Sequence, residues 1–288
     1  MYENDNVGMM DQVGGFELDS NLSMDGVQKK LMPLFLLIDT SGSMSGPKIE
    51  QVKTAVEEIK LQLNMLNIGN PDSDVKISVL CFDDAPRWEA KMESPELINP
   101  DLQLGTMTMM GAAFVELEKM LSRSQLIQKG QCAGYKRAVM ILLTDGMPSD
   151  DVDSGILKLK TNNWFVKGTR IAFAIGDQAD ETCLAKFTGN PENVLRVNNM
   201  NLLGTILANV AVVLSTTATH AAGISSDDAT TQAQRDKEFG KSAEETTKLV
   251  EDAIEEQIVT GELDGDKVSK TDDGFIFEGW TDPSDPQN

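Results

Sequence analysis

Residues 34–43 read LFLLIDTSGS, and this stretch decides the fold. Five apolar residues run without a break into Asp39, which indicates a strand buried on both faces, as in the middle of a parallel sheet. Asp39, Ser41 and Ser43 follow a D-x-S-x-S pattern, so alternate residues of the turn can direct oxygen atoms at one point. Gly42 permits the tight backbone path that such a turn requires.

Beyond this turn the sequence predicts alternating helices and strands. Pro47 suits a first helical turn, and apolar residues then recur at helical spacing as far as Leu66. This alternation favours an α/β fold with a mostly parallel sheet covered by helices on both faces. The further strands are expected at 75–82, 87–92, 138–143, 171–175 and, as a weak edge strand, 194–197. The further helices are expected mainly at 109–126, 180–187 and 201–217.

Polar residues near the ends of the predicted elements indicate a metal site. In sheets of this kind, ligands bind at the carboxyl ends of the strands, where Asp39 and Asp145 both lie. Thr108 precedes a predicted helix and offers a hydroxyl, with Thr106 as the alternative. Carboxylates and hydroxyls suit Mg²⁺, which prefers about six oxygen ligands. Simpler roles stay open: Asp39 and Ser41 could cap a helix, Asp145 could belong to an ordinary turn, and Thr108 could be a cap.

As a set, these motifs resemble the metal-ion-dependent adhesion site of von Willebrand factor A (VWA) domains. The resemblance covers roughly residues 31–218 and includes the threonine before Gly-Ala-Ala and the strand-ending Thr-Asp-Gly. It implies a Rossmann-like doubly wound sheet, a bound Mg²⁺ or Mn²⁺, and a coordination position filled by an Asp or Glu of a partner protein. The metal ligands that it implies are Asp39, Ser41, Ser43, Thr108 and Asp145.

A narrower similarity, carried by LLIDTSGSMSGPKI and ILLTDGMPSDD, is to the bacterial TerY-like subgroup. It implies intracellular assemblies tied to tellurite or stress resistance, often alongside a Ser/Thr kinase and a PP2C-type phosphatase. We therefore expect an interaction or scaffold module that binds a partner carboxylate through its metal.

Composition restricts the partners and the compartment. The formal net charge is −21 and the pI is near 4.3, so the surface repels nucleic acid and anionic lipid and favours cations and basic protein patches. Three widely spaced cysteines do not indicate a disulfide framework. The sequence shows neither a signal-peptide pattern nor a run of 18 apolar residues. We expect a cytoplasmic protein with no nucleic-acid or membrane partner.

The pattern also divides the chain into three parts. Residues 1–30 are polar and are predicted to be a flexible arm, followed by the VWA-like domain at 31–218. Residues 219–288 are expected to form an acidic, largely irregular tail with a helix at 243–259 and an aromatic docking segment at 274–280. An acidic residue of this tail could occupy the chain's own metal site and inhibit it.

An enzymatic function is not expected. His220 is the one histidine of the chain and is far in sequence from the D-x-S-x-S motif, which argues against a Ser–His–Asp arrangement. The segment from Gly42 to Lys48 lacks the spacing of a phosphate-binding loop. The alternative is a metal-dependent phosphoesterase that uses Asp39 and Asp145 at one metal ion.

Overall fold

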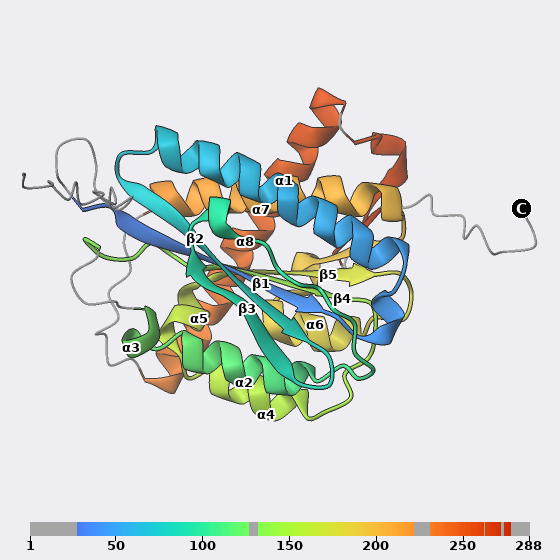
Figure 1. Ribbon diagram of the computed structural model, residues 1–288, viewed down its shortest axis with the longest axis horizontal. Helices are drawn as coiled ribbons and strands as arrows, with labels where there is room; N and C mark the ends of the chain where they lie inside the picture. The colour runs from blue at the N-terminus through green and yellow to red at the C-terminus, as the bar shows by residue number, and fades with distance from the viewer. Residues whose placement is uncertain (1–27, 127–131, 222–230, 262, 272–273, 278–288) are drawn as a thin grey trace, which may run out of the picture.

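The computed structural model describes residues 28–126, 132–221, 231–261, 263–271 and 274–277. They form one eight-stranded sheet with helices on both faces (Figure 1). The strand order is β3-β2-β1-β4-β5-β6-β8-β7, and neighbours are parallel except β2 with β3 and β7 with β8, which confirms the predicted fold class. The strands are β1 Lys30–Asp39, β2 Ser73–Phe82, β3 Pro86–Glu93, β4 Val139–Thr144, β5 Thr169–Ile175, β6 Val194–Val197, β7 Val268–Thr271 and β8 Gly274–Phe277.

The central strand β1 separates two hydrophobic cores, because its alternate side chains point to opposite faces. Leu34 and Leu36 belong to the core that α1 and α7 cover, and Phe35 and Leu37 belong to the core that α2 and α4 cover. Burial on both faces is what the unbroken apolar run requires. The helices are α1 Pro47–Gly69, α2 Met110–Met120, α3 Arg123–Leu126, α4 Val152–Leu159, α5 Asn163–Lys167, α6 Glu181–Thr188, α7 Met200–His220 and α8 Gln232–Thr260, with 3-10 turns at η1 Gly42–Met44, η2 Pro95–Leu97, η3 Pro191–Asn193 and η4 Gly265–Lys267.

The helix predicted at 109–126 is interrupted in the structure. The helix α2 ends at Met120, and the short α3 starts at Arg123. The side-chain amide of Asn162 donates a hydrogen bond of 2.9 Å to the carbonyl of Leu121, which a continuing helix would have used itself. This tertiary contact provides a physical reason for the break.

The C-terminal part differs from the predicted irregular tail. In the described part of residues 219–288, α8 begins eleven residues before the predicted helix start at residue 243, and two strands follow it. The strand β8 pairs with β6 in parallel, so residues 194–197 are an interior strand and not the predicted edge. Residues 274–277 of the predicted docking segment form β8, whereas its last three residues and most of the predicted N-terminal arm lie outside the described residues.

A buried arginine holds α8 against the sheet. Arg170 of β5 has no exposed surface, and its guanidinium donates to the carbonyl of Phe239 at 3.0 Å and the hydroxyl of Ser242 at 2.9 Å. The Phe239 ring lies 4.1 Å from the guanidinium carbon, an arrangement that adds cation–π attraction. Four further bonds run to carbonyls of Phe165, Val166, Gly168 and Thr188.

The helix α7 lies between α1 and α8 and is mostly a core element. The helix is long and apolar enough to cross a membrane by length and composition alone, yet 61% of its apolar 18-residue window is buried within the structure.

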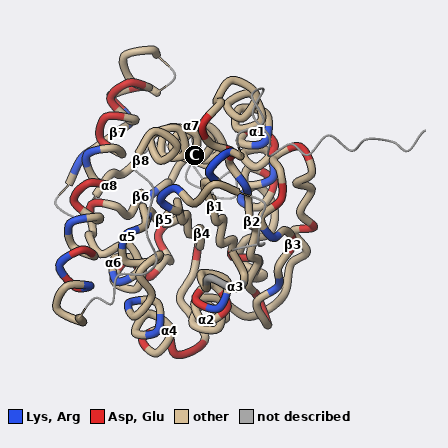
Figure 2. Tube along the Cα trace, turned by 90° about the vertical axis from the view of Figure 1, so that its left-hand side faces the viewer, with Lys and Arg blue, Asp and Glu red and all other residues tan. Residues whose placement is uncertain are grey.

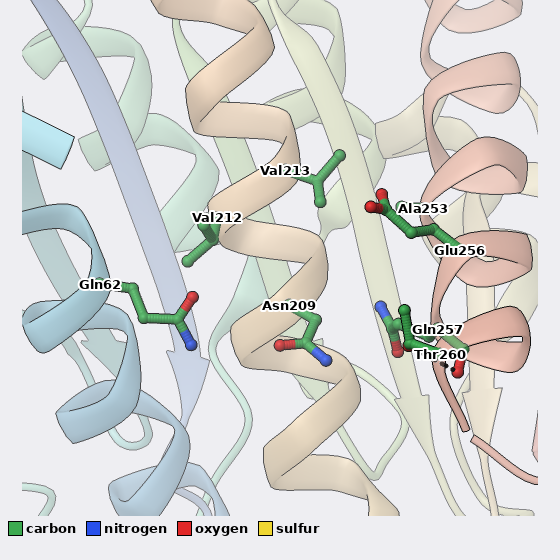
Figure 3. A pocket seen from close by; sticks show the side chains of 8 residues that line it. All are labelled: Gln62, Asn209, Val212, Val213, Ala253, Glu256, Gln257 and Thr260. Carbon is green, nitrogen blue, oxygen red and sulfur yellow. Dashed lines mark hydrogen bonds between the residues drawn. The ribbon is translucent and has the colours of Figure 1, made fainter. Parts of the chain in front are cut away.

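A pocket of about 170 Å³ lies between α7 and α8, with Gln62 of α1 at its edge (Figure 3). Gln257 is 4% exposed, and within the described residues its amide nitrogen and oxygen make no hydrogen bond.

Candidate metal centre

The two predicted acidic ligands lie at the carboxyl edge of neighbouring central strands. Asp39 is the last residue of β1, and Asp145 follows the last residue of β4. In the parallel register Ile38 pairs with Leu143, so both chains leave the sheet at the same edge. Asp39 and Asp145 are at most 1% exposed, so the fold buries two carboxylates at one edge of the sheet.

Hydroxyl groups connect these two carboxylates. Ser43 donates to Oδ1 of Asp145 at 2.7 Å, and the hydroxyls of Ser41 and Ser43 are 3.0 Å apart. The amide of Ser41 donates to Oδ1 of Asp39 at 2.8 Å, and the Thr144 hydroxyl donates to its Oδ2 at 2.5 Å. Four of the five predicted ligands, Asp39, Ser41, Ser43 and Asp145, therefore form one continuous hydrogen-bonded group.

The electrostatics of this group favour a cation. Burial raises the pKa of Asp39 above its ordinary value, and the negative charge of Asp145 adds to the rise, although hydrogen bonds from Thr144 and Ser41 oppose it. Burial disfavours a carboxylate because water no longer solvates its charge. A divalent ion held by these side chains would compensate the buried charge of Asp39, whose donors Thr144 and Ser41 are neutral.

The hydrogen bonds distinguish the two candidate threonines. Thr108 is 6% exposed, and its backbone exchanges two hydrogen bonds with Ser149, which follows Asp145 by four residues. Thr106 is exposed, and its hydroxyl donates to Asp84 at 2.6 Å. The Thr106 hydroxyl is thus held by the loop after β2, and Thr108 is the better placed of the two toward the loop of Asp145.

Sequence reasoning missed two charged residues of this edge. Asp83 follows β2, is 7% exposed, and accepts hydrogen bonds from Thr40 at 2.9 Å and from Arg87 at 3.0 Å. Lys48 lies near the start of α1, with its ammonium 2.5 Å from Oδ2 of Asp145. The signal for Asp83 was available, because an aspartate after a buried strand is the same pattern that identified Asp39.

A glycine lets the Thr106–Thr108 loop approach Asp83. The amide of Gly105 donates to the carbonyl of Thr40 at 2.8 Å. A Cβ atom at position 105 would lie 2.6 Å from the Cβ of Asp83, which is closer than side chains tolerate. The loop that carries both candidate threonines is therefore packed directly against the end of β1.

The side chains present fit a hard divalent cation. Among the described residues, no three His, Cys, Asp or Glu side chains gather as a metal cluster, so an ion here would depend on hydroxyl oxygens beside the two carboxylates. Such all-oxygen donors suit Mg²⁺ or Mn²⁺ and leave coordination positions for water or for another carboxylate.

Comparison with known families identifies the domain that carries this site. The von Willebrand factor type A domain matches residues 34–209, which is more than half of the chain. The chain belongs to the VWA family. The matched VWA region includes all five predicted ligands and ends within α7, before α8 begins. No curated protein matches the chain.

Several solved structures resemble this chain at low sequence identity. A von Willebrand factor type A structure from Catenulispora acidiphila is 16% identical with a TM-score of 0.50, over 65% of this chain and 43% of that one. The pilus adhesin SpaC of Lactobacillus rhamnosus GG is 16% identical with a TM-score of 0.50, over 69% of this chain and 32% of the adhesin. Proximal thread matrix protein 1 of the mussel byssus has zinc in its metal-ion-dependent adhesion site (MIDAS) motif. It is 17% identical with a TM-score of 0.49, over 65% of this chain and 48% of that protein. The chain spans less than half the length of each of these structures.

Proposed function

We propose that this chain is a metal-dependent protein-interaction module. In this proposal Mg²⁺ or Mn²⁺ binds at the carboxyl edge of the sheet, and a partner protein supplies an Asp or Glu to it. The observation that carries the proposal is the pair of buried carboxylates joined by serine hydroxyls. The proposed ligands are Asp39, Ser41, Ser43, Thr108 and Asp145.

The chemistry of the ligands favours recognition over catalysis. Two carboxylates and neutral hydroxyls leave the ion electrophilic, so it gains from an incoming carboxylate. The helix α7 has 21 residues. It begins at Met200, which lines the pocket beside Asp145 at the carboxyl edge of the sheet, and it ends at His220. At 1.5 Å per residue, His220 lies about 30 Å from that edge, too far for a general base there.

The cellular setting is part of the proposal. The similarity of the two metal-site motifs to the TerY-like subgroup supports a cytoplasmic complex in tellurite or stress resistance, with a Ser/Thr kinase or a PP2C-type phosphatase as a partner. The net charge of −21 supports partners that present basic patches around the acidic residue that reaches the metal.

Affinity purification from the native host tests the interaction. We expect the wild-type chain to retain a partner in Mg²⁺ and to release it in chelator, whereas Asp39→Ala retains none, because the ion loses one of its two carboxylates. Glu57→Ala is the matched control, since this exposed glutamate pairs with Lys60 in the middle of α1 and its removal is expected to leave retention unchanged.

Two outcomes contradict the proposal. Retention that is indifferent to chelator and to Asp39→Ala would remove the metal from the interaction. Phosphate-ester turnover in Mn²⁺ that disappears in Asp145→Ala would identify the alternative, a phosphoesterase.

A further inference from the structure

Lys48 places a positive charge on one of the two buried carboxylates. Its ammonium lies 2.5 Å from Oδ2 of Asp145 and 3.4 Å from the carbonyl of Ser43. The side chain of Asp145 has no exposed surface, and its other oxygen accepts the Ser43 hydroxyl. Both oxygens of Asp145 are therefore engaged, one of them by a cation that the chain itself provides.

The other carboxylate is held in a different way. Asp39 accepts hydrogen bonds from the Thr144 hydroxyl and the Ser41 amide, which are neutral donors. Lys48 also lies in the first turn of α1, where the helix dipole disfavours a cation. Helix electrostatics therefore do not explain the position of Lys48, whereas attraction to Asp145 does.

We propose that Lys48 is an internal competitor for the metal ion, so that a divalent cation binding Asp145 displaces the Lys48 ammonium from Oδ2. An ammonium and a divalent ion cannot share one buried oxygen without strong repulsion, because water screens charges poorly there. Lys48 thereby lowers the metal affinity of the site. Only an ion that is attracted to Asp145 more strongly than the Lys48 ammonium can bind there. This inference rests on the function proposed above.

The structure provides space for the displaced side chain. A pocket of about 360 Å³ opens beside Asp145 and is lined by Lys48, Gly176, Asp177 and Asn198 among others. Asp177 is exposed and offers an alternative carboxylate on the rim. The four-carbon stem of lysine can turn into this pocket without disturbing the packed core.

Titration calorimetry of the full chain with MgCl₂ and MnCl₂ tests the proposal. We expect Lys48→Met to bind Mg²⁺ about tenfold more tightly than wild type, because the competitor is gone. Lys48→Arg keeps the charge and binds no more tightly than wild type. The matched control is Lys53→Met, which removes a lysine that pairs with the exposed Glu50 on the same helix and leaves the affinity within about twofold.

A thermal melt separates competition from a purely structural role. In chelator, Lys48→Met is expected to unfold at a lower temperature than wild type, because Asp145 is left buried without its cation. Added Mg²⁺ is expected to raise its midpoint more than that of wild type. Metal binding by wild type with equal or weaker binding by Lys48→Met overturns the inference alone. No binding by either protein overturns both the inference and the proposed function, and binding by Lys48→Met alone supports the inference.

Discussion

Individual hydroxyls decide how the two buried carboxylates are held. Ser43 bridges toward Asp145, and Thr144 holds Asp39 from the neighbouring strand. Thr144 comes immediately before Asp145, so one short segment positions the first carboxylate and supplies the second. This arrangement explains why small polar residues surround Asp39, where a larger side chain would separate the two acids.

Replacing Thr108 by valine tests its role as a ligand. Valine keeps the branched shape and removes the hydroxyl, so we expect Mg²⁺ affinity to fall about tenfold, or about 1.4 kcal/mol, by calorimetry. Thr106→Val is the comparison, and its effect is expected to stay within twofold because that hydroxyl is bonded to Asp84. The reverse order of effects would assign the hydroxyl ligand to Thr106.

At the scale of elements, α8 is the addition that the matched family region does not cover. Its buried stripe starts at Phe239 and continues through Ser242, Thr246 and Thr247 to Val250 and beyond. Polar members of this stripe bond inward, as Thr247 does with Asn193 at 2.9 Å. Both acidic and basic residues lie along α8 (Figure 2).

Removing the Phe239 ring tests how firmly α8 is attached. The ring is 8% exposed and packs on Arg170 and Phe165, so Phe239→Ala is expected to lower the free energy of unfolding by about 3 kcal/mol in urea titrations. Val259→Ala, on the same helix but 86% exposed, is expected to change it by less than about 0.5 kcal/mol. Equal and small effects would mean that α8 does not depend on this contact.

At the scale of the whole molecule, the C-terminal segment and the VWA region share one sheet. The strand β8 pairs with β6, and α8 contributes Val250 and Ile254 to the core around α1 and α7. Gly274 has a φ of +121°, and a Cβ atom there would lie 2.4 Å from the carbonyl of Val194, so only glycine fits this junction. The division of the chain at residue 218 remains a prediction from composition.

A shared sheet predicts cooperative unfolding. We expect one urea transition, with coincident midpoints for far-ultraviolet dichroism, which reports all helices, and for the fluorescence of the chain's three tryptophans, among them buried Trp164. A separate early loss of helical signal would show that α8 unfolds by itself and behaves as an appendage. Limited proteolysis of the native chain supplies a second readout, since cleavage within α8 should be slow in a cooperative unit.

The sequence by itself determined the central strand, the parallel α/β fold and the D-x-S-x-S turn, because burial on both faces leaves an unbroken apolar run. Only the tertiary structure decided where α8 begins, where β8 joins the sheet, and that Lys48 pairs with Asp145. The start of α8 is hidden in sequence because serine and threonine fill part of its buried stripe, and β6 is interior only because β8 arrives from 77 residues beyond its end. The ion pair of Lys48 with Asp145 joins residues 97 positions apart, so no local pattern could reveal it.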